Sequence, residues 1–206
     1  MLHDLPRDAG VHFHVQHRWL GWDDAGALRF ATAGQSTGGS NLGSLLSLGS
    51  NVDPETHLRA AIAALRARFD DVVVSAVYRF PAVGYTGPDF LNAAAVIDSD
   101  LDPFALNDWL HALEDAHGRD RSGPRFGDRP LDIDIVFYDD LVLEGPGNLK
   151  LPRPELQHAF VLKPLADIAP RHVVPGDGRT LAVLWAAHPE NARPPQVDAL
   201  DLAAAS

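Results

Sequence analysis

Cysteine is absent from the 206-residue sequence, and lysine occurs only at Lys150 and Lys163. Without cysteine the chain forms no disulfide and offers no thiolate ligand to a metal ion. Both lysines follow leucine, and neither ends a Gly-x-x-x-x-Gly-Lys-Ser/Thr segment, so a P-loop is excluded. Any phosphate group that binds must therefore be held by metal ions and by arginine.

The sequence also lacks a long apolar run and an excess of positive charge. No run approaches the roughly 20 apolar residues that a membrane-spanning helix needs, and no basic segment followed by an apolar one marks a secretory signal. The formal net charge is -11, which argues against general binding to nucleic acid or to an anionic membrane. We expect a monomeric cytoplasmic protein that acts on small molecules.

The chain divides by composition into three parts. The composition of residues 1–43 predicts a flexible N-terminal extension, which contains His12, His14 and His17. This histidine pattern is compatible with a metal site, but a polar tail explains it more simply because no carboxylate completes the set. The folded domain is predicted at residues 44–188, and a polar C-terminal tail is predicted at residues 189–206.

The folded domain shows four strand patterns and two helix patterns. The strands are expected at 45–48, 72–78, 91–97 and 131–138. The helices begin at Asp53-Pro54 and Asp102-Pro103, where aspartate would serve as the N-cap and proline would occupy the first helical position. This order predicts an α+β fold of the ferredoxin-like βαββαβ type, with an antiparallel sheet that leaves one face open to a ligand. The segment after the fourth strand predicts a C-terminal covering subdomain.

Asp132 and Asp134 lie on the fourth predicted strand. Because side chains alternate along a strand, both carboxylates point to one face, which Tyr138 continues, whereas Phe137 is expected on the core face. Two neighbouring carboxylates repel each other, so a hard cation such as Mg²⁺, completed by nucleotide phosphates, is expected between them. A solvated strand face is the alternative for an isolated Asp-x-Asp pair.

A long loop with several glycines leads into this strand. It runs from Arg119 to Pro130 and also carries Arg121, Arg125 and Arg129. Clustered positive charge in an acidic chain indicates an anionic ligand, and arginine holds phosphate oxygens in a fixed bidentate geometry. A mobile charged loop beside a metal site fits phosphoryl transfer from ATP. A solvated basic loop is the alternative.

Ordered segments between Leu45 and Trp185 resemble the 6-hydroxymethyl-7,8-dihydropterin pyrophosphokinase family of folate biosynthesis. The most specific segment is Arg129-Pro130-Leu131-Asp132-Ile133-Asp134. Others are Leu48-Gly49-Ser50-Asn51, Tyr78-Arg79, Phe90-Leu91-Asn92-Ala93-Ala94, Gly118-Arg119 and Pro164-Leu165-Ala166-Asp167-Ile168-Ala169-Pro170. The resemblance implies an ATP-dependent diphosphokinase, a transferase that moves the β,γ-pyrophosphoryl unit of ATP to the pterin hydroxymethyl group and leaves AMP.

The resemblance also implies roles for particular residues. Asp132 and Asp134 would bind two Mg²⁺ ions that bridge the triphosphate, and Arg119 and Arg129 would be catalytic arginines that assist the transfer. The implied pterin-binding residues are Phe80, Pro81, Ala82, Val83, Phe90, Asn92, Phe126 and Phe160. The implied ATP-binding residues are His111, Glu114, Arg121, Arg153 and His158.

Several features depart from the family pattern, among them Phe90, which stands where tyrosine is common. Arg153 stands where the family often has histidine, Phe126 stands where it often has tryptophan, and the segment from Arg153 to Phe160 is one residue shorter than usual. Arg153 and the shortened segment leave open a non-catalytic homologue that binds pterin or nucleotide. A nucleotidyl transferase or cyclase with two metal ions is a further alternative, supported by fold analogy alone, and it does not explain Asn92 or the aromatic side chains around it.

Overall fold

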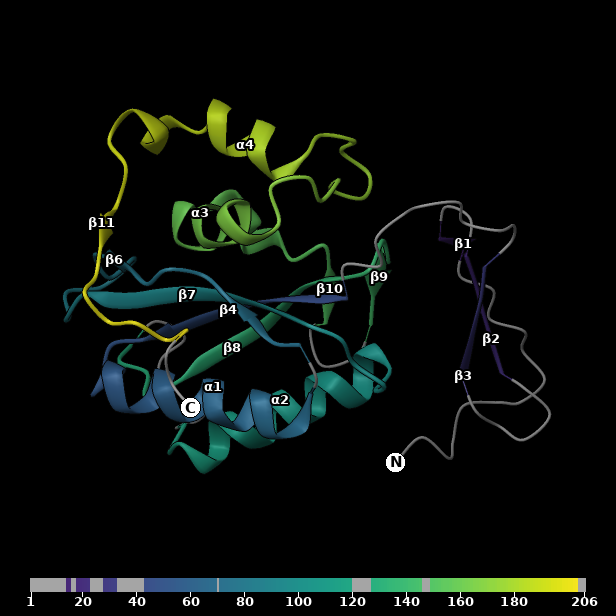
Figure 1. Cartoon of the computed structure of the whole chain (residues 1–206), viewed down its shortest axis with the longest axis horizontal. Helices are drawn as coiled ribbons and strands as arrows, with labels where there is room; N and C mark the ends of the chain where they lie inside the picture. Colours follow the sequence, from purple (N-terminus) through teal and green to yellow (C-terminus); the bar gives the residue numbers. More distant parts are fainter. Residues whose placement is uncertain are drawn as a thin grey trace. The chain divides into compact units, whose positions relative to one another are not determined.

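The protein divides into two compact units, residues 1–40 and 41–206. A computed structural model describes residues 43–69, 71–119, 127–145 and 149–203, together with the backbone of three strands in the first unit (Figure 1). These are β1 (His14–Val15), β2 (Arg18–Trp22) and β3 (Leu28–Thr32), which form an antiparallel sheet in that order. His12 and His17 lie outside the described residues, and the flexibility of this extension stays a prediction.

The second unit is built on one antiparallel sheet. Its strands are β4 (Ser44–Ser50), β6 (Tyr78–Phe80), β7 (Phe90–Ile97), β8 (Asp132–Tyr138) and β11 (Gln196–Val197). They lie in the order β11-β6-β7-β4-β8, and every neighbouring pair is antiparallel. Strands β6, β7, β4 and β8 follow the order second, third, first and fourth along the chain, which confirms the predicted ferredoxin-like α+β fold.

The predicted strand at 72–78 is two short strands, β5 (Val73–Val74) and β6. Both pair with β7. Ser75 lies between them, and its hydroxyl oxygen accepts a hydrogen bond of 2.8 Å from the backbone amide of Ala94. A side chain therefore takes a place in the sheet ladder that a backbone carbonyl would otherwise fill, and the strand is interrupted there.

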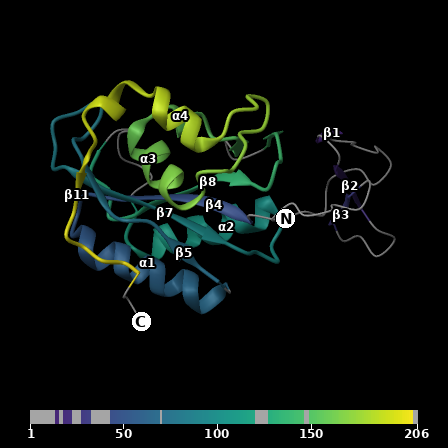
Figure 2. The same ribbon diagram turned by 45° about the horizontal axis from the view of Figure 1, so that its top comes forward.

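Helices α1 (Pro54–Arg68) and α2 (Pro103–Ala116) cover one face of the sheet (Figure 2). Asp102 caps α2 as predicted, because its carboxylate accepts hydrogen bonds from the amides of Phe104 and Ala105 at 2.8 and 2.9 Å. Asp53 makes no such bond, since its backbone is left-handed with φ of 43° and a capping residue needs an extended backbone. The predicted side-chain cap at Asp53 is therefore wrong.

Helices α3 (Ala159–Ile168) and α4 (Leu181–Ala187) lie on the opposite side of the sheet from α1 and α2 (Figure 2). They correspond to the predicted covering subdomain, and α3 packs on β7. Their apolar side chains form a cluster with Leu45, Ala94, Val136 and Phe137. This cluster closes one part of that face and leaves the rest accessible.

A bulge in β8 reverses the alternation that the sequence predicts. Leu46 pairs with Ile135 but Leu45 pairs with Phe137, so Val136 is an extra residue in β8. Phe137 consequently packs in the cluster under α3. The Tyr138 hydroxyl donates a hydrogen bond to the Leu101 carbonyl, just before α2. Phe137 is buried as predicted, at 1% exposed, but on the side of the sheet that α3 covers. The predicted face of Tyr138 is wrong, because one inserted residue turns every later side chain to the other face.

The rest of the second unit is short elements. Strands β9 (Leu143–Glu144) and β10 (Lys150–Leu151) form a hairpin, and η2 (Pro154–Gln157) leads into α3. After η3 (Pro189–Ala192), β11 pairs with β6, and the side chain of Leu202 is 1% exposed. The described part of the segment predicted as a polar tail thus lies along the domain, because it carries apolar side chains to bury. Within the described ranges, every helix is too short or too polar to cross a lipid bilayer.

Candidate active site

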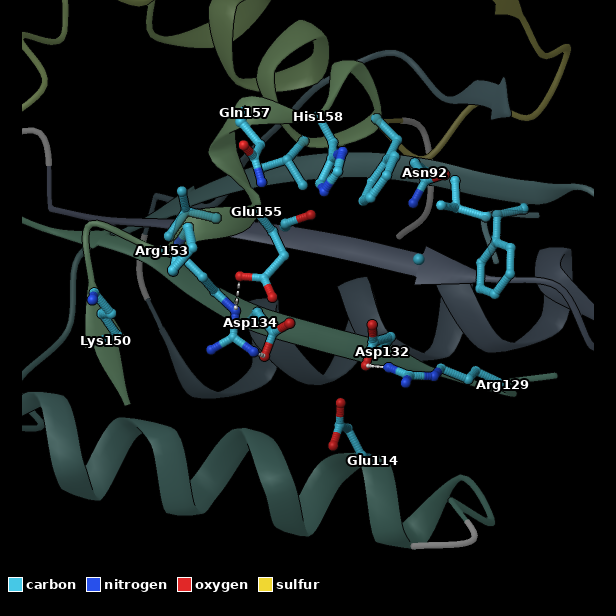
Figure 3. A pocket seen from close by; sticks show the side chains of 18 of the residues that line it. Asn92, Glu114, Arg129, Asp132, Asp134, Lys150, Arg153, Glu155, Gln157 and His158 are labelled. Carbon is cyan, nitrogen blue, oxygen red and sulfur yellow. Dashed lines mark hydrogen bonds and ion pairs between the residues drawn. The ribbon is translucent and has the colours of Figure 1, made fainter. Parts of the chain in front are cut away.

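A cavity of about 1150 Å³ is lined by β4, β7, β8, α2, the loop after β6, and the segment from β10 to the start of α3 (Figure 3). Most of the residues predicted from the sequence line it: Phe80, Pro81, Val83, Phe90, Asn92, His111, Glu114, Arg119, Arg129, Asp132, Asp134, Arg153, His158 and Phe160. Ala82 does not line it. Arg121 and Phe126 lie outside the described residues.

Asp132 and Asp134 both point into the cavity from β8 (Figure 3). The Oδ1 atom of Asp132 lies 2.5 Å from Arg119 Nη1 and 2.7 Å from Arg129 Nη1. Burial disfavours the charged form of Asp132, but Arg129 and Arg119 outweigh it and hold its pKa below the usual value. Asp132 is therefore a carboxylate that stays charged between two arginines.

Asp134 has a weaker counter-charge. Its Oδ1 lies 2.7 Å from Arg153 Nη2. Burial, and then repulsion from Asp132, raise the pKa of Asp134 to about 7, although Arg153 acts in the opposite direction. The two carboxylates on this strand thus differ in how well their charge is compensated.

This pair of carboxylates fits a hard divalent cation. An added cation would relieve the repulsion that raises the pKa of Asp134, and both side chains present oxygen atoms, which such ions prefer. In the part of the chain that the structure describes, no group of three or more histidine, aspartate and glutamate side chains forms a metal-binding cluster. A cation held here would therefore take its remaining ligands from phosphate oxygens and water.

Glu114 positions one of the arginines. Its side chain is 2% exposed, and its Oε1 accepts a hydrogen bond of 3.0 Å from the Ile133 amide and lies 3.3 Å from Arg119 Nη1. Arg119 also donates to the Leu131 carbonyl at 3.2 Å. A buried acid on α2 thus holds the guanidinium of Arg119 against the start of β8, beside Asp132.

Asn51 supports the cavity without lining it, a role that the sequence did not reveal. Its Oδ1 accepts a hydrogen bond of 2.7 Å from the Arg129 amide. Its Nδ2 donates to Asp128 Oδ1 and to the Tyr85 hydroxyl, both at 2.8 Å. Asn51 therefore joins the end of β4 to the two loops that flank the cavity. The available signal was a polar residue placed directly after a buried strand.

The other end of the cavity is aromatic. The rings of Phe80 and Phe160 meet edge to face with centroids 6.2 Å apart. The ring of His158 stacks on Phe160 at 5.0 Å. Phe90 lines the same region from β7. These side chains form an apolar wall suited to a flat ring.

Asn92 supplies the polar group at this end. Its side chain is 6% exposed, and its Oδ1 has no hydrogen-bond partner among the residues that the structure describes. Gly49 lies opposite Asn92 in the sheet, and a Cβ at Gly49 would come within 2.8 Å of Asn92 Nδ2. A buried acceptor without a partner is costly to fold, so the Asn92 oxygen is placed to bind a donor on a ligand.

The cavity is also lined by residues whose hydrogen-bonding or charged groups the sequence did not mark as part of a site. They are Ser47, Tyr85, Asn107, Glu144, Lys150, Glu155 and Gln157. Lys150, Glu155 and Gln157 flank Arg153 along the chain, and this proximity was the one local signal that they belong to the site. The others come from separate elements, which only the folded chain brings together.

Comparison with known proteins agrees with this geometry. The model of the family 7,8-dihydro-6-hydroxymethylpterin-pyrophosphokinase (HPPK) matches residues 45–170. A 2-amino-4-hydroxy-6-hydroxymethyldihydropteridine pyrophosphokinase of Synechocystis is 39% identical over 146 residues, which cover 69% of this chain and 74% of the relative. The protein of that name from Pseudomonas aeruginosa is 40% identical over 149 residues, which cover 70% of this chain and 90% of the relative.

Among solved structures, one of Plasmodium falciparum HPPK-DHPS aligns with a TM-score of 0.49 and 14% identity, over 68% of this chain and 41% of that chain. The sequence matches carry the assignment. The family model spans the strands from β4 to β8 together with α3, and it includes both carboxylates and the two arginines beside Asp132. The chain belongs to the HPPK family.

Proposed function

We propose that the chain transfers the β,γ-pyrophosphoryl group of ATP to 6-hydroxymethyl-7,8-dihydropterin, giving AMP and the pterin diphosphate in folate biosynthesis. The observation that carries this proposal is the two-ended cavity. One end holds paired carboxylates among arginines. The other end is lined by aromatic rings and holds a buried amide oxygen that has no hydrogen-bond partner in the described ranges. A triphosphate suits the first end, and a flat hydrogen-bonding heterocycle suits the second.

The metal that we propose is Mg²⁺, as two ions held by Asp132 and Asp134. When bound, these ions would neutralise phosphate charge and polarise the group that is transferred. Arg119 and Arg129 already lie beside Asp132, so their positive charge reaches the same region. The transition state of phosphoryl transfer spreads negative charge over the equatorial oxygens, and we assign these two arginines to its stabilisation.

The remaining nucleotide contacts are proposed for residues on two walls. His111 and Glu114 line the cavity from α2, and Arg153 and His158 line it from the segment before α3. Glu114 acts through Arg119, which it holds in place. Arg121 stays a predicted ATP contact outside the described residues.

The pterin is proposed to bind at the aromatic end. The Oδ1 of Asn92 would accept a hydrogen bond from a ring N–H, which satisfies an atom that has no hydrogen-bond partner within the described part of the chain. Phe90 and Phe160 would flank the ring, and Phe80, Pro81 and Val83 would form the adjoining wall. Ala82 and Phe126 stay predicted contacts. An apolar wall also excludes water, which favours transfer to the hydroxymethyl oxygen over hydrolysis.

We further propose that the enzyme works as a monomer in the cytoplasm. The substrates proposed for it are small molecules, in keeping with the acidic charge that disfavours nucleic acid and anionic membranes.

The test is the identity of the nucleotide product. With ATP, Mg²⁺ and hydroxymethyl-dihydropterin, we expect one AMP per pterin diphosphate, and no AMP when the pterin is omitted. Release of ADP in place of AMP would overturn the proposal. Pterin binding by calorimetry in the presence of a Mg²⁺-bound ATP analogue, together with no AMP at all, would favour the non-catalytic homologue.

A further inference from the structure

Arg153 lies on the cavity side of Asp134 (Figure 3). Its Nη2 is 2.7 Å from Asp134 Oδ1, and the two side chains are 21% and 23% exposed. Its backbone amide donates a hydrogen bond of 3.0 Å to the Val136 carbonyl of β8. The backbone of Arg153 is thus tied to the same strand as the carboxylate, and its guanidinium is aimed at the place where a cation would bind.

This ion pair competes directly with a metal ion. A guanidinium within hydrogen-bonding distance of a carboxylate oxygen occupies one of its lone pairs, and it repels a second cation at the same oxygen. The repulsion is strong because both side chains are largely withdrawn from water, which screens charge. Asp134 therefore cannot serve Arg153 and a divalent ion fully at the same time.

The surroundings give Arg153 another carboxylate to approach. Glu155 Oε2 lies 3.6 Å from Arg153 Nε, and the Glu155 side chain is 43% exposed. Both residues line the cavity in which we place the triphosphate. An arginine released from Asp134 can therefore turn towards phosphate oxygens, which it binds in bidentate geometry, without leaving the wall that carries it.

We propose that Arg153 is an internal counter-cation of Asp134, which means that its guanidinium neutralises this carboxylate until the metal–nucleotide complex binds. The guanidinium then changes partner and contacts the phosphates of the nucleotide. This inference rests on the proposed function of the same cavity. A free divalent ion must displace Arg153 and leaves it only Glu155, which is 43% exposed and whose Oε2 lies 3.6 Å from Arg153 Nε. A metal-bound triphosphate supplies several charged oxygens in addition. Arg153 thereby makes the site bind the metal–nucleotide complex in preference to the free ion. By linkage, the nucleotide raises the affinity for the metal by the same factor as the metal raises the affinity for the nucleotide.

A purely structural role is the alternative. The pair could serve only to fasten the segment before α3 to β8, through the ion pair and the backbone hydrogen bond to Val136. A structural pair predicts lower stability when it is broken, but no change in metal affinity. The two roles therefore separate in a binding measurement that needs no turnover.

The measurement is a titration of the full chain with Mn²⁺ alone, in which the electron paramagnetic resonance signal reports the concentration of free ion. We expect Arg153→Gln to bind Mn²⁺ about tenfold more tightly than the wild type. Arg153→Lys keeps the charge and should stay near the wild type. Arg179→Gln removes one positive charge from an exposed ion pair with Asp177, and as the matched control it should leave Mn²⁺ affinity unchanged.

The second arm adds the non-hydrolysable α,β-methylene analogue of ATP. Arg153→Gln should now bind the Mn²⁺-bound analogue more weakly than the wild type, because the phosphates have lost an arginine. Arg153→Met, of similar length and without charge, repeats both arms if the glutamine variant does not fold. Equal Mn²⁺ affinity in the wild type and the neutral variants would overturn the inference.

The outcome is independent of the AMP assay. If the neutral variants bind Mn²⁺ more tightly but the wild type releases no AMP, the counter-cation is upheld and the proposed reaction is excluded. AMP release with unchanged Mn²⁺ affinity in the neutral variants would do the reverse, and it would leave the ion pair a structural one.

Discussion

Gly49 is the position where one methyl group should impair pterin binding selectively. It lies on β4 opposite Asn92, and a Cβ there would stand 2.8 Å from Asn92 Nδ2 and 3.7 Å from Phe90 Cδ1. Its backbone does not have positive φ, so alanine meets no backbone strain. The perturbation Gly49→Ala therefore acts through the Asn92 side chain, which must rotate away.

Two opposed contributions determine the change in the free energy of unfolding, and one contribution determines the change in pterin affinity. Turning Asn92 off its rotamer costs about 0.5–1.5 kcal/mol, while replacing glycine by alanine at an unstrained position stabilises by about 0.4–1 kcal/mol. The free energy of unfolding should therefore change by less than about 1 kcal/mol. The lost hydrogen bond from the ligand to Asn92 Oδ1 is worth about 1–3 kcal/mol, which weakens pterin affinity roughly 5- to 150-fold.

The assay is calorimetric titration of hydroxymethyl-dihydropterin into the enzyme saturated with Mg²⁺ and the α,β-methylene ATP analogue. Affinity for that analogue should change much less than pterin affinity. Gly49 pairs with Asp132 in the sheet, but the three atoms nearest to the added Cβ belong to Asn92 and Phe90. In a double-mutant cycle, Gly49→Ala should add little to Asn92→Ala. Unchanged pterin affinity in Gly49→Ala, or full additivity with Asn92→Ala, would refute the reasoning.

Three further predictions concern the charged end and its supports. Asn51→Ala should lower the free energy of unfolding by about 2–4 kcal/mol in urea, since its hydrogen bonds to Arg129, Asp128 and Tyr85 are lost; an unchanged midpoint contradicts this. Arg129→Ala should reduce kcat by roughly 100-fold while changing ATP affinity much less, because its charge matters most in the transition state; equal losses in both would exclude that role. In the metal-free enzyme, the folded state holds a proton on Asp134 up to about pH 7, whereas the unfolded chain releases it near pH 4. Stability relative to Asp134→Asn should therefore fall as pH rises from about 4 to 7, by at most roughly 1.4 kcal/mol per pH unit, and a flat difference would contradict the raised pKa.

The parts of this protein that could be predicted are those that depend on neighbouring residues. The cap of α2 at Asp102 uses amides only two and three positions away, so it can be recognised locally. The order of strands and helices follows from apolar periodicity in the same way. Asp53 shows the limit: its sequence matches the same capping pattern, but a left-handed backbone removes the cap.

By itself, then, the sequence determined the ferredoxin-like order, the carboxylates on one strand face and the arginines that precede them, because each rests on alternation, helical spacing or adjacency along the chain. Only the tertiary structure decided the bulge at Val136 and the partners of Asn51, which lie 34 and 77 positions away. It also decided the position of Arg153 on Asp134. The physical reason is that sheet register and loop packing select these partners, and residues far apart in sequence leave no local pattern that records which of them will meet.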